Sequence, residues 1–137
     1  MKLAYGGAVV NAQGQVVLRR VANNFGGYVW SWPMGRPDHG ESPEKTALPV
    51  VLEETGYTNK ITSQLPGRFV GGLTANIMYL MRPLGAPGPF CWESSEIRWI
   101  DSEEAPALIN QTTHKTGRDR GLVILAVSIK AMKRATT

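Results

Sequence analysis

The sequence predicts a mixed α/β fold, in which short strands form a sheet between two main helices. Three observations lead to this prediction. Short apolar segments bounded by glycine, proline or asparagine recur along the chain, which is typical of strands. Residues 43–55 carry the start and stop signals of a helix, and residues 118–134 carry an apolar stripe at helical spacing. Strands that pair between two such helices give an α/β or α+β sandwich.

The first two apolar runs, residues 3–10 and 15–21, predict a β-hairpin in which Gly14 supplies the turn. Residues 22–29 are rich in turn formers and predict a loop. A short aromatic-rich segment follows at residues 29–32 and ends at a proline. The chain then turns into the glycine-containing segment that precedes the first helix.

The first helix is predicted over residues 43–55. Ser42 is a good N-cap, Pro43 suits the first helical position, and Gly56 is a left-handed terminator. Pro49 lies inside this span, where a proline removes one hydrogen bond and costs roughly 3 kcal/mol. We therefore expect a kink or a late start of the helix.

Further strands are expected at residues 57–65, 68–70, 76–81 and 97–100, with a loop at residues 83–89. Two more helices are expected at residues 102–110 and 118–134. Ser102 is the expected N-cap of the short helix. The last helix should pack on the sheet through its apolar stripe.

The length of 137 residues fits one domain, which we expect to span residues 1–137. A single cysteine, Cys91, excludes an intramolecular disulfide framework and favours a cytoplasmic location. The N-terminus has no signal-peptide pattern and no segment is apolar enough to span a bilayer, so we expect no membrane partner. The net charge of +4 attracts polyanions, but the basic residues are scattered. A small phosphate-bearing partner accounts for this charge, and a dedicated nucleic-acid partner is not expected.

Glu53 and Glu54 lie next to each other near the end of the predicted helix. Positions 50, 53 and 54 are spaced i, i+3 and i+4, so they share one face. Three carboxylates there would suit Mg²⁺ or Mn²⁺, but residue 50 is a valine. Taken alone, a pair of glutamates on a helix is more often a solvated face.

The spacing of these residues resembles the Nudix family motif. That motif reads Gly, five residues, Glu, seven residues, Arg-Glu, an apolar residue, any residue, Glu-Glu, any residue, Gly and an apolar residue. The residues that fall in register without a gap are Gly35, Glu41, Val51, Glu53, Glu54, Gly56 and Tyr57. Residues 32–35 (WPMG) resemble the family's Trp-x-x-Pro-Gly-Gly approach, with Met34 in place of a glycine. Residues 93–104 (ESSEIRWIDSEE) look like its acidic loop, tryptophan-bearing strand and short helix.

The resemblance implies a Nudix-type α/β/α sandwich with a mixed β-sheet between helices. It also implies hydrolysis of the diphosphate of a nucleotide or nucleoside diphosphate derivative with Mg²⁺ or Mn²⁺. A homodimer is a further implied partner, because dimers are common in the family.

The resemblance also implies roles for individual residues. By their positions in the motif, Glu53 and Glu54 are expected to be metal ligands and catalytic residues. Glu41 is expected as an auxiliary ligand, and Gly35 as a carbonyl ligand or a tight turn. A further carboxylate that binds metal or activates water should come from downstream, and we select Glu96 for this catalytic role. The other candidates in that region are Glu93, Glu103 and Glu104.

The chain departs from the motif at Pro49-Val50, where the family has Arg-Glu. Loss of a catalytic base typically costs ~10²–10⁴ in rate. Either a downstream carboxylate takes over, or the protein is a catalytically impaired member that binds a nucleotide-like ligand or a protein partner. Direct binding of RNA by the basic surface is a third interpretation.

Candidate substrate contacts lie outside the motif. The rings of Tyr28, Trp30 and Trp32 are expected to stack on a nucleobase, with burial in the core as the alternative. Arg36, at the mouth of the loop, is expected to face a diphosphate. Residues 112–120 lead into the last helix, whose N-terminus favours anions, and an exposed capping loop is the alternative. Substrate specificity should lie in residues 25–32 and 83–92.

Overall fold

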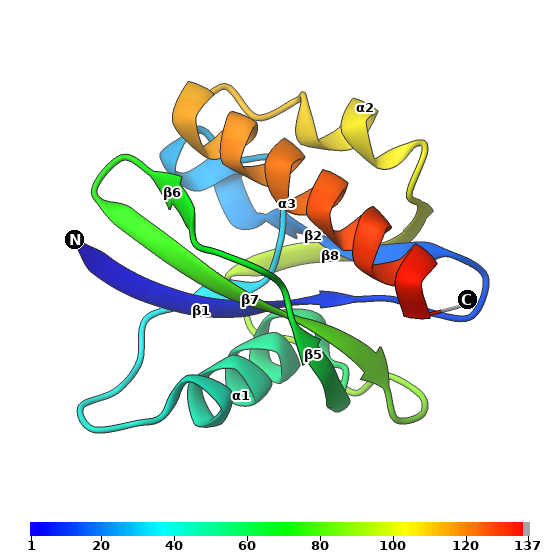
Figure 1. The fold of residues 1–137 in the computed structure, drawn as a ribbon. Coiled ribbons are helices and arrows are strands. Elements are labelled where there is room, and N and C mark those ends of the chain that lie inside the picture. The colour runs from blue at the N-terminus through cyan, green and yellow to red at the C-terminus, as the bar shows by residue number, and fades with distance from the viewer. Residues whose placement is uncertain (136–137) are drawn as a thin grey trace.

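The computed structural model describes residues 1–135, so the last two residues of the expected domain lie outside the described part. The chain forms an α/β sandwich (Figure 1). Its strands are β1 (Lys2–Val9), β2 (Gln15–Val21), β3 (Trp30–Ser31), β4 (Met34–Gly35), β5 (Asn59–Gln64), β6 (Phe69–Gly71), β7 (Thr74–Pro83) and β8 (Ser94–Asp101). Its helices are the 3₁₀ segment η1 (Ala22–Gly27), α1 (Pro43–Thr55), α2 (Ala105–Ile109) and α3 (Lys115–Ala135).

The strands of residues 1–135 form two sheets. The larger has the order β4-β1-β7-β5, with β6 also paired to β7, and the smaller has the order β3-β2-β8. The β1–β7 pair is parallel whereas β1–β4, β5–β7 and β6–β7 are antiparallel, so the larger sheet is mixed as expected.

Helices cover both faces of the strand layer. In Figure 1, α1 lies on one side of the larger sheet, and α2 and α3 lie on the other. Successive residues of a strand point to opposite faces. Accordingly, Val17 and Met81 join the apolar cluster under α1, whereas Leu18 and Leu80 join the cluster under α2 and α3. The predicted sandwich of helix, sheet and helix is confirmed.

Helix α1 begins and ends where its capping residues predict. The Ser42 side chain accepts a hydrogen bond from the Lys45 amide, and Gly56 terminates the helix with a φ of 81°. The helix continues through Pro49 from its start at Pro43, so the expected late start is wrong. Pro49 and Lys45 are both exposed, and water can therefore satisfy the Lys45 carbonyl that the proline leaves without a donor.

The prediction of a β-hairpin at the N-terminus is wrong, except for its turn. Gly14 does supply the turn, with a φ of 77°, and a single bridge joins Val10 to Val16. Beyond this bridge the two strands separate into different sheets, β1 beside β7 and β2 beside β8. The long ladders with distant strands bury both faces of each strand, which a local two-stranded ribbon cannot do.

The C-terminal helices differ from the expectation at their starts. Helix α2 is shorter than predicted, and its N-cap is Glu104 with no side-chain cap bond, so Ser102 is not the cap. Helix α3 begins at Lys115, three residues before the predicted start, so residues 115–117 also belong to the helix. No helix of residues 1–135 is long and apolar enough to cross a membrane.

Candidate active site

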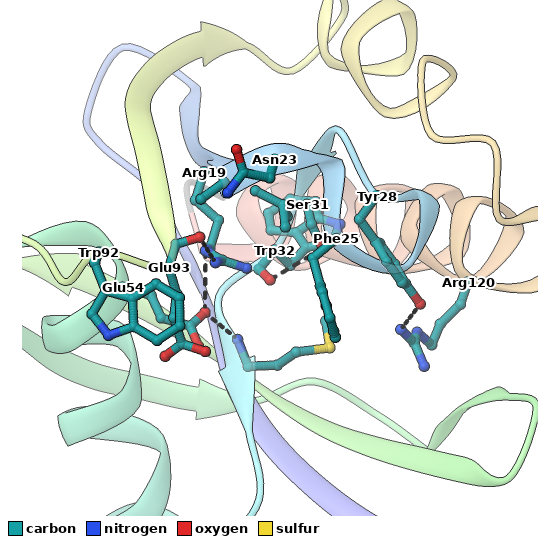
Figure 2. Close-up of a pocket in the computed structure, with 13 residues that line it drawn as sticks. Arg19, Asn23, Phe25, Tyr28, Ser31, Trp32, Glu54, Trp92, Glu93 and Arg120 are labelled. Atoms are coloured by element: carbon teal, nitrogen blue, oxygen red, sulfur yellow. Dashed lines mark hydrogen bonds and ion pairs between the residues drawn. The ribbon is translucent and has the colours of Figure 1, made fainter.

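A pocket of about 380 Å³ opens between the C-terminal end of α1, strands β2 and β3, η1 and α3. Its charged lining residues are Arg19, Glu54, Glu93 and Arg120, and its aromatic ones are Phe25, Tyr28, Trp32 and Trp92. Figure 2 shows Glu54, Glu93 and Trp92 at one end and Tyr28 with Arg120 at the other. The end of the motif helix therefore forms one wall of a mainly apolar cavity.

Glu54 and Arg19 form the charged centre of this pocket. Oε1 of Glu54 lies 3.5 Å from Nε of Arg19 and accepts a hydrogen bond from the Met34 amide at 3.2 Å. Arg19 also donates to the Ser94 hydroxyl and to the Glu93 carbonyl, each at 2.7 Å. The Ser94 hydroxyl in turn donates to the Glu54 carbonyl. These bonds fix the end of α1 against β2 and the start of β8.

The pKa of Glu54 is raised from 4.5 to about 7. Burial is the largest cause, since it disfavours the charged form. The Arg19 charge and the Met34 amide lower the pKa but do not offset burial, and the charges of Glu93 and Glu53 raise it further. A carboxyl that changes protonation near neutral pH inside a cleft is typical of a functional group.

The side chain of residue 50 packs against the strand that precedes the helix. A methyl group at Gly35 would meet Cγ2 of Val50 at 3.1 Å, so the valine side chain lies directly on the glycine of β4. Gly35 itself pairs with Tyr5 of β1. An apolar contact thus occupies the place where the motif has its first helix glutamate.

The other acidic residues of the motif differ in placement. Glu53 is exposed on α1, beside Glu54, and its carbonyl accepts a hydrogen bond from the Cys91 amide at 2.7 Å. Glu41 is exposed on the preceding loop, where its Oε1 accepts from the Asp38 amide at 3.0 Å. Among residues 1–135, no three His, Cys, Asp or Glu side chains are grouped closely enough to hold a metal ion.

These carboxylates would fit a divalent cation that is held together with a phosphate-bearing ligand. Glu53 and Glu54 are adjacent, and Glu93 is near enough to raise the pKa of Glu54. Such a gathering of carboxylates favours a cation. Mg²⁺ is commonly held by one or two carboxylates together with substrate phosphates, and it does not require a protein cage. The residues therefore fit a weakly held ion better than a site formed in advance.

The downstream carboxylates are separated by β8. Glu93 precedes the strand and lines the pocket. Glu96, which we selected, is not among the lining residues, and its Oε2 forms an ion pair with Arg98 at 2.9 Å. Glu103 and Glu104 follow the far end of the strand and are exposed. Of the four candidates, the structure brings only Glu93 to the pocket.

The three aromatic candidates do not share one environment. Trp30 is 3% exposed in the core, and the Arg98 guanidinium lies 4.7 Å from its ring centroid. Trp32 is 1% exposed but forms part of the pocket wall, with its indole N–H bonded to the Gly121 carbonyl. Tyr28 is half-buried, lines the pocket and stacks on His114. Arg36 is exposed and does not line the pocket.

Sequence reasoning missed the individual roles of Arg19 and Arg120. Arg19 lies in an apolar strand where a charged residue is unusual, and this was the available signal. Arg120 falls at the end of the segment that was expected to attract anions. Phe25 and Trp92, 81% and 84% exposed at the pocket, lie in the two segments predicted to carry specificity.

Known proteins resemble this chain in sequence and in fold. The family model for the NUDIX domain matches residues 2–120. A Xenopus laevis protein named nucleoside diphosphate-linked moiety X motif 6 is 32% identical in an alignment that covers 86% of this chain and 58% of that protein. This chain therefore spans less than two thirds of that relative.

Two further proteins are similar. An RNA pyrophosphohydrolase of Novosphingobium aromaticivorans is 28% identical in an alignment that covers 74% of this chain and 78% of that protein. The solved structure of a NUDIX hydrolase from Nitrosomonas europaea superposes with a TM-score of 0.72 at 13% identity and covers 87% of this chain and 84% of that one. At this identity, the structural likeness concerns the fold.

Proposed function

Because this chain belongs to the Nudix family, we propose that it hydrolyses the diphosphate linkage of a nucleoside diphosphate derivative with the help of Mg²⁺ or Mn²⁺. The observation that carries this proposal is the position of Glu54. This motif carboxylate points into a pocket with aromatic walls, next to Glu93 and Arg19. The name of the Novosphingobium relative, a pyrophosphohydrolase, supports the same bond type.

In this proposal the aromatic and the charged residues of the site have different tasks. Exposed aromatic rings such as Trp92 and Phe25 bind the apolar part of the substrate. Glu53 and Glu54 hold the cation, which polarises the phosphoryl oxygens when bound. Arg19 attracts the carboxylate of Glu54 and donates to the backbone carbonyl of Glu93, so that it holds these two residues next to each other.

Glu93 is the proposed base, since it is the downstream carboxylate that lines the pocket. It takes a proton from a water molecule as the water oxygen bonds to phosphorus. The bridging P–O bond then breaks, and the departing phosphate keeps the electron pair. Loss of a base typically costs ~10²–10⁴ in rate, and Glu93→Gln should show a loss of this size.

The direct test is a substrate panel with Mg²⁺ or Mn²⁺. It contains nucleotides, sugar nucleotides, dinucleoside polyphosphates and 5′-capped RNA, and released products are separated by chromatography. Turnover that is lost in Glu54→Gln but kept in Glu103→Gln, an exposed carboxylate outside the pocket, supports the proposal. Absence of product from every substrate with either metal contradicts it.

A second candidate function is binding without turnover, and the contact between Val50 and Gly35 favours it. The apolar packing removes one carboxylate from the site that the family uses for catalysis. This candidate predicts a thermal shift with a nucleotide ligand, little effect of Mg²⁺ and no product. Activity that appears only in the double variant Pro49→Arg, Val50→Glu would support it, and ordinary turnover by the parent chain would exclude it.

A further inference from the structure

Arg120 is a cation in the pocket wall for which residues 1–135 provide no carboxylate partner. Its Nη2 donates to the Tyr28 hydroxyl at 3.0 Å, whereas its Nε is buried and has no hydrogen-bond acceptor. An unpaired polar group withdrawn from water is unfavourable, and more so when it is charged. Arginine in such a position normally has an anionic partner.

The side chain of Arg120 is held in this position by its surroundings. A methyl group at Gly71 of β6 would come within 2.7 Å of Nη1 of Arg120. A methyl group at Gly117 of α3 would collide with the Tyr28 hydroxyl. Two glycines from different elements therefore leave the room that the Tyr28–Arg120 pair occupies. The stacking of Tyr28 on His114, at 5.4 Å between ring centroids, fixes the tyrosine further.

The two arginines of the pocket differ in charge compensation. Arg19 has the carboxylate of Glu54 at 3.5 Å and two further acceptors at 2.7 Å. Arg120 has one neutral acceptor and lies at the opposite end of the pocket (Figure 2). The pocket therefore offers an uncompensated positive charge at the end remote from Glu54.

We propose that Arg120 is a specificity-determining residue, which binds a second anionic group, a phosphate or a carboxylate, on the part of the ligand remote from the diphosphate. The inference rests on the proposed function, which places the diphosphate at Glu53 and Glu54. A guanidinium suits either anion, because its planar N–H groups match the paired oxygens of both. The substrate class is thus a nucleoside diphosphate derivative that carries one more anionic group.

The experiment compares ligands that differ only in this group. UDP-glucuronate against UDP-glucose tests a carboxylate, and ADP-ribose 2′-phosphate against ADP-ribose tests a phosphate. Dissociation constants are measured by calorimetry with Mg²⁺ and, in parallel, with EDTA. The charged member of at least one pair should bind about tenfold more tightly, as for a charge-assisted hydrogen bond. The pair that shows the preference identifies the anion.

Variants then assign the preference to Arg120. Arg120→Gln should remove it, and Arg120→Lys should keep part of it, because the charge remains while the planar fork is lost. The matched control is Arg118→Gln, which makes the same change of net charge on the same helix outside the pocket and should keep the preference. Thermal unfolding checks that each variant is folded. If Arg120→Gln does not fold, a preference in Arg120→Lys as large as that of the parent chain contradicts the inference.

Two outcomes overturn the inference. One is equal binding within both pairs by the parent chain, and the other is a preference that persists in Arg120→Gln. Neither depends on turnover, so this result is separate from the test of the proposed function. A chain that hydrolyses both members of each pair alike keeps the proposed function and loses this inference. A chain that binds the charged members selectively but shows no turnover keeps this inference and loses the proposed function.

Discussion

The carboxylate of Glu54 lies 3.5 Å from the guanidinium of Arg19, and their side chains are only 13% and 11% exposed. An arginine so close would normally keep a carboxyl well ionised. Burial outweighs this attraction and raises the pKa of Glu54 to about 7. The protonation of Glu54 therefore changes near neutral pH, and small changes around the pair should have measurable effects.

Replacement of Glu54 by glutamine should change how stability depends on pH. A carboxyl whose pKa is raised from 4.5 to about 7 on folding stabilises the folded state below pH 4.5, and this contribution is lost as the pH rises through 7. The difference corresponds to on the order of 3 kcal/mol. The free energy of unfolding of Glu54→Gln should therefore fall less than that of the parent chain between pH 4.5 and 8.

Urea denaturation at several pH values measures this effect. Glu53→Gln is the matched control, since its side chain is the exposed neighbour on the same helix, and it should keep most of the pH dependence of the parent. Parallel pH profiles for Glu54→Gln and the parent chain would show that Glu54 is not the titrating group.

Arg19→Gln should destabilise the protein more at pH 8 than at pH 5. The substitution leaves the Glu54 charge without its cation, a loss of about 3 kcal/mol for a buried pair. Because Arg19 lowers the pKa of Glu54, its removal also moves that pKa upward, so that protonation relieves the cost at low pH. Arg20→Gln changes an exposed arginine on the same strand and should alter stability by less than about 0.5 kcal/mol. Equal unfolding curves for the two variants would argue against a stabilising role for the Arg19–Glu54 pair.

Val50→Glu should raise the affinity for a divalent metal in the absence of nucleotide. Positions 50, 53 and 54 share one helix face, so the new carboxylate adds a third oxygen donor to that face. Calorimetric titration with Mn²⁺ should show weak binding by the parent in the absence of nucleotide, and at least about tenfold tighter binding by the variant. Leu52→Glu adds the same charge on another side of the helix and serves as the control. A similar gain from both substitutions would mean that net charge, and not the helix face, controls the affinity.

Trp92→Ala should weaken ligand binding without lowering stability. The side chain is 84% exposed at the pocket, so its loss should change the free energy of unfolding by less than about 0.5 kcal/mol. Stacking on a base is worth ~1–3 kcal/mol, so the dissociation constant should rise about fivefold or more. Trp32→Phe should instead destabilise the fold by roughly 1–3 kcal/mol, since Trp32 is 1% exposed and its N–H is bonded to Gly121. An unchanged dissociation constant in Trp92→Ala would remove this ring from the binding surface.

The local sequence predicted helix α1 well, because its signals act over a few residues. Ser42 and Gly56 satisfy the backbone groups at the ends of the helix wherever the helix packs. Pro49 did not cause the late helix start that was expected, since the cost of a proline depends on whether water reaches the carbonyl that it leaves without a donor, and exposure is a property of the folded chain. The hairpin failed for a related reason, because β1 and β2 find longer ladders with strands more than 60 residues away.

The sequence by itself determined the family and the place of the carboxylates on α1, because a motif with fixed spacing needs only the period of a helix. The tertiary structure decided the composition of the pocket. It brought Arg19 from β2 and Glu93 from the loop before β8 to Glu54, placed Arg120 at the opposite end, and left Glu96 with Arg98. These residues are separated by tens of positions, and their contacts arise from strand pairing and helix packing that no local pattern encodes.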